Sequence, residues 1–218
     1  MKKTTMKWAK AITIIGLALV LFSPLKAADA MTILTWNISF PFDQTKEFSL
    51  DSESFRGIGF EYRMFVQPNF SVGVYAGWHV FNGDTTKTIH VETEGDEALI
   101  ADITGKQFRY INSFPIMLNL NYYIGNPNGT QAYLGLGAGT MIIEERVELG
   151  VVAAEQTRWH IAIAPEIGFK IPFDYNFSGL ASVKYHYAFP AKRITGEKYS
   201  HSYISVNIGL AWDHHFIF

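Results

Sequence analysis

The last segment of the chain alternates strictly between bulky apolar residues and small or polar ones. From Ile204 to Phe218, every second residue is bulky and apolar except His214. A period of two over this length predicts a β-strand with one apolar face. Seven other segments alternate in the same way, over residues 34–43, 57–66, 70–80, 108–122, 134–142, 158–171 and 181–189. The sequence therefore predicts an all-β chain of eight strands.

The connections between these strands alternate between short and long. The short ones, residues 67–69, 125–131 and 174–176, carry the Pro, Gly, Asn and Asp residues of tight turns. The long ones, residues 44–54, 82–106, 150–157 and 192–201, are more polar. This alternation is typical of an outer-membrane barrel, with tight periplasmic turns and extended outside loops. An even number of strands then places both termini on the periplasmic side.

A chain that crosses a membrane as strands must pair every backbone N–H and C=O group, because hydrocarbon offers no other partner. Pairing the first strand with the eighth removes both free edges. We therefore expect an eight-stranded, antiparallel, up-and-down transmembrane β-barrel. The segments run from 9 to 15 residues, which is enough for the roughly 9–11 residues of a tilted spanning strand.

Alternation alone leaves open which face is inside, so a soluble barrel or sandwich with an apolar interior is the alternative. In that case the second face would meet water and be rich in Lys, Glu and Thr. Instead it carries many glycines, which suit the crowded inner wall of a narrow barrel. We therefore expect the bulky face to meet lipid. The glycines are Gly57, Gly59, Gly73, Gly77, Gly135, Gly137, Gly139, Gly168 and Gly209.

The first thirty residues have the three-part pattern of a cleaved secretory signal peptide. Lysines precede an apolar stretch over residues 11–22, and Ala28-Asp29-Ala30 supplies the small residues that a signal peptidase reads. We expect cleavage after Ala30, with Ala27 or Ala28 as alternatives, and one barrel domain over residues 31–218. The apolar stretch is shorter than the roughly 20 residues of a membrane-spanning helix.

Composition narrows the class of function. The chain has 15% aromatic and 17% charged residues, whereas ordinary soluble domains have about 25% charged residues. The absence of cysteine excludes disulfides, thiolate metal sites and a cysteine-linked lipid anchor. No cluster of Lys and Arg follows the signal region, so we expect no nucleic-acid partner. Nothing implies a cofactor or a metal.

Several stretches resemble the small bacterial outer-membrane β-barrel family that includes OmpA-, OmpX- and OmpW-like proteins. They are residues 67–73, 114–123, 132–139, 165–168 and the terminal strand, within a likeness that covers residues 33–218. The resemblance implies a monomer in the outer membrane, in contact with lipid and lipopolysaccharide. It also implies that Trp212, Phe216 and Phe218 form the C-terminal signal read by the barrel-assembly machinery. An ordinary edge strand that ends in an aromatic residue is the alternative.

An eight-stranded barrel encloses a space that side chains alone can fill. Buried charges persist only when they are paired and hydrogen-bonded, so we interpret the inward charged residues as an ion-pair network that plugs the lumen. A charged conduit for small solutes is the alternative. The residues are Glu61, Arg63, Arg109, Glu145, Glu166, Lys170, Lys184 and Asp213.

Other groups of residues carry less specific signals. Some outer-membrane lipid-modifying enzymes are eight-stranded barrels, and a Ser/His/Asp set could meet inside this one. No stretch resembles the motifs of those enzymes, so we expect no enzyme. Adjacent His214 and His215 point to opposite faces of their strand. The acidic connection 82–106 predicts a solvated hairpin or, alternatively, a surface for cations or a partner. The residues of the Ser/His/Asp set are His160, Ser182, His186 and Asp213.

Three residues interrupt the pattern. Pro115 and Pro165 remove hydrogen-bond donors inside strands, so we expect bulges near them, and Asn112 on the lipid face is expected close to the outer headgroups. Two classes of function remain. One is a structural or surface-interaction protein that acts through its loops, and the other is a narrow porin-like channel for small or hydrophobic solutes.

Overall fold

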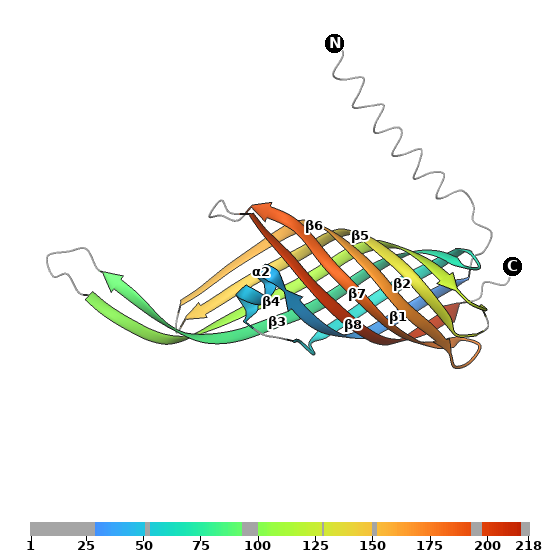
Figure 1. Cartoon of the computed structure of the whole chain (residues 1–218), viewed down its shortest axis with the longest axis horizontal. Helices are drawn as coiled ribbons and strands as arrows, with labels where there is room; N and C mark the ends of the chain where they lie inside the picture. The colour runs from blue at the N-terminus through green and yellow to red at the C-terminus, as the bar shows by residue number, and fades with distance from the viewer. Residues whose placement is uncertain are drawn as a thin grey trace, which may run out of the picture.

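The computed structural model describes residues 29–50, 53–92, 100–127, 129–149, 152–192 and 198–214. Over these residues the chain forms a closed barrel of eight antiparallel strands in sequence order, with one short helix (Figure 1). The elements are β1 (Ala30–Phe42), α2 (Asp43–Ser49), β2 (Gly57–Gln67), β3 (Phe70–Glu92), β4 (Ile100–Ile124), β5 (Gln131–Leu149), β6 (Val152–Pro172), β7 (Phe177–Lys192) and β8 (Lys198–His214).

The first and last strands close the barrel. β1 pairs with β8 along its whole length, from Ala30–His214 to Phe42–Ser202. The predicted eight-stranded up-and-down barrel is therefore confirmed. Because Ala30 lies opposite His214, the start of β1 and the end of β8 share one end of the barrel, called here the terminal end. The opposite end, where β3–β4 and β5–β6 turn back, is called the hairpin end.

The outer face of the barrel is apolar. Leu118, Ile161 and Ile167 are 65%, 74% and 55% exposed, whereas charged residues such as Arg63 and Lys184 are buried inside. This distribution suits hydrocarbon outside and a polar, filled interior, so it contradicts the soluble alternative and makes the barrel a transmembrane one. Among the described residues, no helix is long and apolar enough to span a membrane.

The strands are longer than the alternation predicts. β3 and β4 pair as far as Glu92–Ile100, and β5 and β6 pair as far as Leu149–Val152. Figure 1 shows the β3–β4 ribbon projecting far beyond the body of the barrel. Most of the expected connection 82–106 is thus a two-stranded hairpin, as one of the two interpretations held. Residues 1–28, which contain most of the expected signal peptide, and the terminal Phe216 and Phe218 lie outside the described residues.

The expected bulges at Pro115 and Pro165 do not form. On β4 the register with β3 is the same on both sides of Pro115, and on β6 the register with β7 is the same on both sides of Pro165. Around each proline, only its own pair and one neighbouring pair are missing, because each ring removes one donor without inserting a residue. A register shift does occur between Ala188 and Ala191 of β7, the segment that contains Pro190.

Two inner-wall glycines make room for tyrosine rings. A Cβ atom on Gly77 would lie 2.4 Å from the hydroxyl oxygen of Tyr75, and one on Gly168 would lie 2.6 Å from the ring of Tyr133. No Cβ atom fits at such distances, so glycine lets both rings lie against the wall and fill the lumen.

The helix α2 was not predicted from the sequence. It follows β1 directly, and both its first residue, Asp43 (φ 45°), and the residue after its end, Leu50 (φ 63°), have positive φ. These two left-handed positions turn the chain into the helix and out of it. The buried Thr45 and Ser49 belong to this helix, which hydrogen-bonds to β8 across the mouth at the hairpin end.

The exposed apolar face generates a first prediction. Ile163→Arg places a charge on the lipid side of β6, where Ile163 is 37% exposed, and should cost about 2–4 kcal/mol of folding free energy near the bilayer midplane. Denaturant unfolding in lipid vesicles would measure this cost. The matched control is Thr157→Arg, an exposed position on the same strand nearer the hairpin end, which should be nearly neutral. Equal costs at the two positions would contradict the assignment of the lipid face.

Candidate functional site: the barrel lumen

Four buried charges form the centre of the lumen. Arg63 donates two hydrogen bonds to Glu61, from Nε at 2.7 Å and from Nη2 at 3.0 Å. The same Nη2 atom lies 3.5 Å from Glu166 Oε2, and Lys184 Nζ lies 3.2 Å from that oxygen. Lys184 is also 3.7 Å from Glu61. This set, called here the central cluster, contains two acids and two bases and is electrically neutral.

Neutral side chains complete the hydrogen bonding of the central cluster. Arg63 Nη1 donates to the hydroxyl of Tyr123 at 2.8 Å, and Asn119 donates to Glu61 at 2.7 Å. The hydroxyl of Tyr133 donates to Glu166 at 2.7 Å. The guanidinium of Arg63 also lies 4.6 Å from the centre of the Tyr133 ring. A buried charge is tolerated only with such partners, so β2, β4, β5, β6 and β7 are fixed to one another through the cluster.

A second charged pair closes the terminal end. Lys170 Nζ donates to Asp213 Oδ1 at 2.8 Å, and Ser178 donates to the other carboxylate oxygen at 2.9 Å. A buried apolar cluster lies beside this pair, since Met31 is opposite Asp213 and Leu180 is opposite Lys170 in register, and Phe65 packs against it. The lumen is therefore filled on the terminal side of the central cluster. The packed residues are Met31, Ile33, Tyr123, Tyr133, Leu180 and Ala211.

A layer of histidine and tyrosine rings lies on the other side of the central cluster. The ring of His186 stacks on Tyr203 with centroids 4.5 Å apart, and His79 lies 5.2 Å from His186. Ser39 Oγ is 2.8 Å from His79 Nδ1, and the Tyr75 hydroxyl is 3.2 Å from His79 Nε2. Sequence reasoning did not select His79, Tyr75 or Tyr203. Their inward position in the alternation was the only signal available.

Two of the expected network residues lie apart from the other charges. Arg109 donates to Gln107 and to the carbonyl oxygen of Phe48 in α2, and it has no acidic partner among the described residues. Glu145 lies 3.5 Å from His201 at the hairpin end. The eight residues expected in one network thus form a central cluster, a terminal pair and two separate sites. Their heights along the barrel differ, which sequence position within isolated strands does not reveal.

The helix α2 closes the hairpin end of the lumen. Gln44 Oε1 accepts hydrogen bonds from the backbone N–H and the hydroxyl of Ser200, and the hydroxyl of Tyr199 donates to the carbonyl oxygen of Gln44. The ring of Phe48 packs onto the buried apolar cluster below it. The helix is therefore anchored to the inner wall by both polar and apolar contacts.

The Ser/His/Asp set considered from the sequence does not assemble. His186 contacts Ser205, Ser182 accepts a hydrogen bond from Asn207, and Asp213 pairs with Lys170. His160 lies near the hairpin end, where its Nδ1 is 2.9 Å from the carbonyl oxygen of Phe189. Within the described residues, no three His, Cys, Asp or Glu side chains gather in a way that could hold a metal ion.

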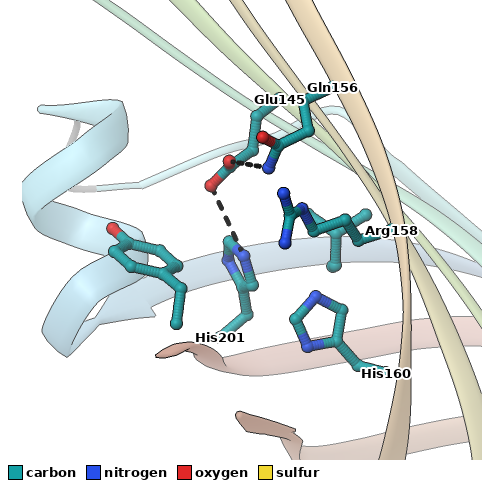
Figure 2. Close-up of a pocket in the computed structure, with 7 residues that line it drawn as sticks. Glu145, Gln156, Arg158, His160 and His201 are labelled. Carbon is teal, nitrogen blue, oxygen red and sulfur yellow. Dashed lines mark hydrogen bonds and ion pairs between the residues drawn. The ribbon is translucent and has the colours of Figure 1, made fainter. Parts of the chain in front are cut away.

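A pocket lies at the hairpin end, beside α2 (Figure 2). Gln156 donates to Glu145 at 3.4 Å, and Glu145 faces His201 on β8. Figure 2 shows Arg158 and His160 of β6 turned toward the same space. The lining residues are Ile143, Glu145, Gln156, Arg158, His160, Tyr199 and His201.

The central cluster generates a second prediction. Lys184→Gln leaves Glu166 and Glu61 with one base between them, so it should destabilise the barrel by about 3–5 kcal/mol, the usual cost of breaking a buried pair. The double variant with Glu166→Gln should lose less than the sum of the two single losses, because it restores charge balance. Urea unfolding in detergent micelles would measure both. Lys106→Gln, which breaks an exposed pair with Asp84, is the control and should cost at most about 1 kcal/mol.

No family model matches this chain, and no curated protein matches its sequence. Its structure is similar to Ail, the attachment invasion locus protein of Yersinia pestis, solved with the heparin analogue sucrose octasulfate. The TM-score is 0.50 at 11% identity, over 87% of this chain and 100% of that one. Neisserial surface protein A gives 0.48 at 10% identity, over 86% of this chain and 97% of that one. OprG from Pseudomonas aeruginosa gives 0.47 at 14% identity, over 88% and 98%. At these identities the likeness concerns the fold, and the chain has the fold of the small outer-membrane β-barrels.

Proposed function

We propose that this protein is an outer-membrane barrel with a sealed lumen, which acts through the parts that project from its hairpin end. The observation that carries the proposal is the filled interior. From the terminal end to the hairpin end, the lumen is occupied by the terminal pair, the central cluster, the ring layer and α2. An eight-stranded barrel has room for side chains or for a conduit, and here side chains take that room.

The projecting hairpins are the parts available to a partner. The β3–β4 ribbon continues well beyond the last residues that pair with β2, since that ladder ends at Gly57–His79. A ribbon of this length is unnecessary for crossing a bilayer, which needs only about 9–11 residues per strand. We therefore assign a surface-interaction or structural role to the hairpin end and no enzymatic role to the barrel.

We infer the orientation of the barrel from the lengths of its connections. The connection Pro68–Asn69 is a tight turn at the terminal end, whereas the long hairpins lie at the other end. Outer-membrane barrels keep short turns in the periplasm and long connections outside. We place both termini in the periplasm and the β3–β4 ribbon outside the cell, with lipid and lipopolysaccharide around the apolar band. Recognition of Trp212 and the residues after it by the barrel-assembly machinery belongs to the same proposal.

A third prediction tests the sealed lumen. Purified protein in planar bilayers should give no large, steady conductance, and deleting residues 43–50 should leave it closed because the central cluster remains in place. A porin inserted under the same conditions is the control for detection. Large, steady single-channel currents from the unmodified protein would favour the narrow channel and contradict the sealed lumen.

A fourth prediction tests location and orientation together. The chain has no cysteine, so Lys106→Cys and Tyr175→Cys each introduce a single thiol. The Lys106 side chain is 56% exposed and lies on the β3–β4 ribbon, and Tyr175 is 73% exposed in a turn at the terminal end. A membrane-impermeant maleimide on intact cells should label position 106 at once. It should label position 175 only after the outer membrane is permeabilised, and the reverse result would invert the orientation.

A further inference from the structure

Two polar side chains in the pocket beside α2 have hydrogen-bonding capacity that the protein does not use. The Nε atom of Arg158 and the Nε2 atom of His160 are buried without a hydrogen-bond partner. Among the ion pairs of the described residues, the neighbouring bases Arg146 and Lys170 each have an acidic partner, and Arg158 has none. His160 is 3% exposed. A buried polar group without a hydrogen-bond partner costs free energy. Two such groups in one pocket therefore point to a ligand that would hydrogen-bond to them.

The proton positions in the pocket follow from the partners. His160 Nδ1 lies 2.9 Å from the carbonyl oxygen of Phe189. A carbonyl oxygen only accepts, so Nδ1 carries the proton and the neutral ring presents a lone pair at Nε2. His201 is occupied differently: its Nδ1 is 3.3 Å from the hydroxyl of Thr45, and its Nε2 faces Glu145 at 3.5 Å. The pocket therefore offers the guanidinium as a donor and His160 as an acceptor.

A ligand that fits must both accept and donate. A carboxylate or a sulfate can accept hydrogen bonds from Arg158, but it has no proton for His160 Nε2 at neutral pH. A phosphate monoester has its second pKa near 6, so it can keep one proton when bound at neutral pH: its bare oxygens then accept from the guanidinium and its P–O–H group donates. Arg binds phosphate oxygens through paired N–H groups. We propose that Arg158 and His160 form a binding site for a phosphate monoester group.

The other charged and titratable groups around the site are compatible with an anion. Glu145 on β5 is the one acid among the described lining residues, and its carboxylate already faces His201 and accepts from Gln156. Tyr199 is held by Gln44 of α2. The lining side chains leave no room for even a water molecule between them, so a ligand can enter only if a side chain moves. Arg158 is half-buried and has no hydrogen-bond partner at Nε, so the proposal requires its side chain to move aside when the phosphate group enters.

Next to the site, the backbones of β6 and β7 are not paired with each other. The β6–β7 ladder ends at Ala162–Ala188, although both strands continue toward the hairpin end. Pro190 has no N–H, and the ring of His160 reaches the Phe189 carbonyl oxygen where the ladder has stopped. Trp159 and Ile161, 66% and 74% exposed, flank this gap in pairing on the outer face. The phosphate group can therefore belong to a soluble monoester, or to the headgroup of an amphiphile that lies against the unpaired part of β6 and β7.

The experiment is calorimetric titration of the refolded chain in phosphate-free, nonionic detergent at neutral pH. The probes are inorganic phosphate, sulfate and a short-chain phosphatidic acid. Inorganic phosphate should bind with saturable heat and sulfate at least about tenfold more weakly, which is the effect of one lost hydrogen bond to a charged group. Tighter binding of phosphatidic acid than of inorganic phosphate assigns the site to an amphiphile, and equal binding assigns it to a soluble monoester.

Variants separate the site from a purely structural role. His160→Asn keeps a donor near the Phe189 carbonyl but removes the nitrogen that faces the pocket, so it should abolish phosphate binding at an unchanged melting temperature. His160→Gln restores a polar group at the pocket side and should recover part of the affinity. Arg158→Gln should lose at least about tenfold in affinity.

Arg146→Gln is the matched control, because Arg146 is a half-exposed arginine on the neighbouring strand that pairs with Glu148. It should leave phosphate affinity unchanged. The proposal is overturned if the unmodified protein binds no phosphate probe, if sulfate binds as tightly as phosphate, or if Arg158→Gln and Arg146→Gln bind phosphate equally.

Discussion

The pairing of β1 with β8 is the constraint on which the other features of this molecule depend. Thirteen residues of β1 face β8 without a break, so the backbone leaves no open edge toward hydrocarbon. Once eight strands are closed, the diameter is small and the inner wall must be filled. The flat tyrosine rings over Gly77 and Gly168 and the stacked layers of side chains are consequences of that narrow circumference.

Closure also explains the composition of the interior. A polar lumen cannot hold a single unpaired ion, so each charge near the middle of the barrel has an opposite one within reach. The bidentate contact between Arg63 and Glu61 lies within one strand, two residues apart. Glu166 and Lys184 lie opposite each other on neighbouring strands. Local pairing of this kind balances the charges within β2 and between the neighbouring strands β6 and β7, and the hydrogen bonds to Tyr123 and Tyr133 then join these strands across the lumen.

The sequence predicts the parts of the fold that depend on period two. Ile163, Leu118 and their neighbours face outward as expected, because lipid on one side and packing on the other impose the alternation. Outside the lipid both faces of a ribbon meet water, so the alternation of apolar and polar residues fades there. For this reason the sequence predicts shorter strands than the structure has. The pairing of Arg63 with Tyr123 depends on register between distant strands, which a single sequence does not encode. Seven-residue α2 has too few turns for a helical pattern and is held by tertiary contacts.

The position of α2 links the two ends of the polypeptide. The helix follows the first strand, yet Gln44 and Thr45 find their hydrogen-bond partners at Ser200, His201 and Ser202 of the last one. During assembly, therefore, Gln44 and Thr45 lack these hydrogen-bond partners until β8 has arrived and the ring is complete. An intermediate that lacks β8 would have an uncovered mouth and an open lateral edge at the same time. The mouth is therefore covered only when assembly is complete, because β8 both closes the barrel against β1 and provides the hydrogen-bond partners of α2.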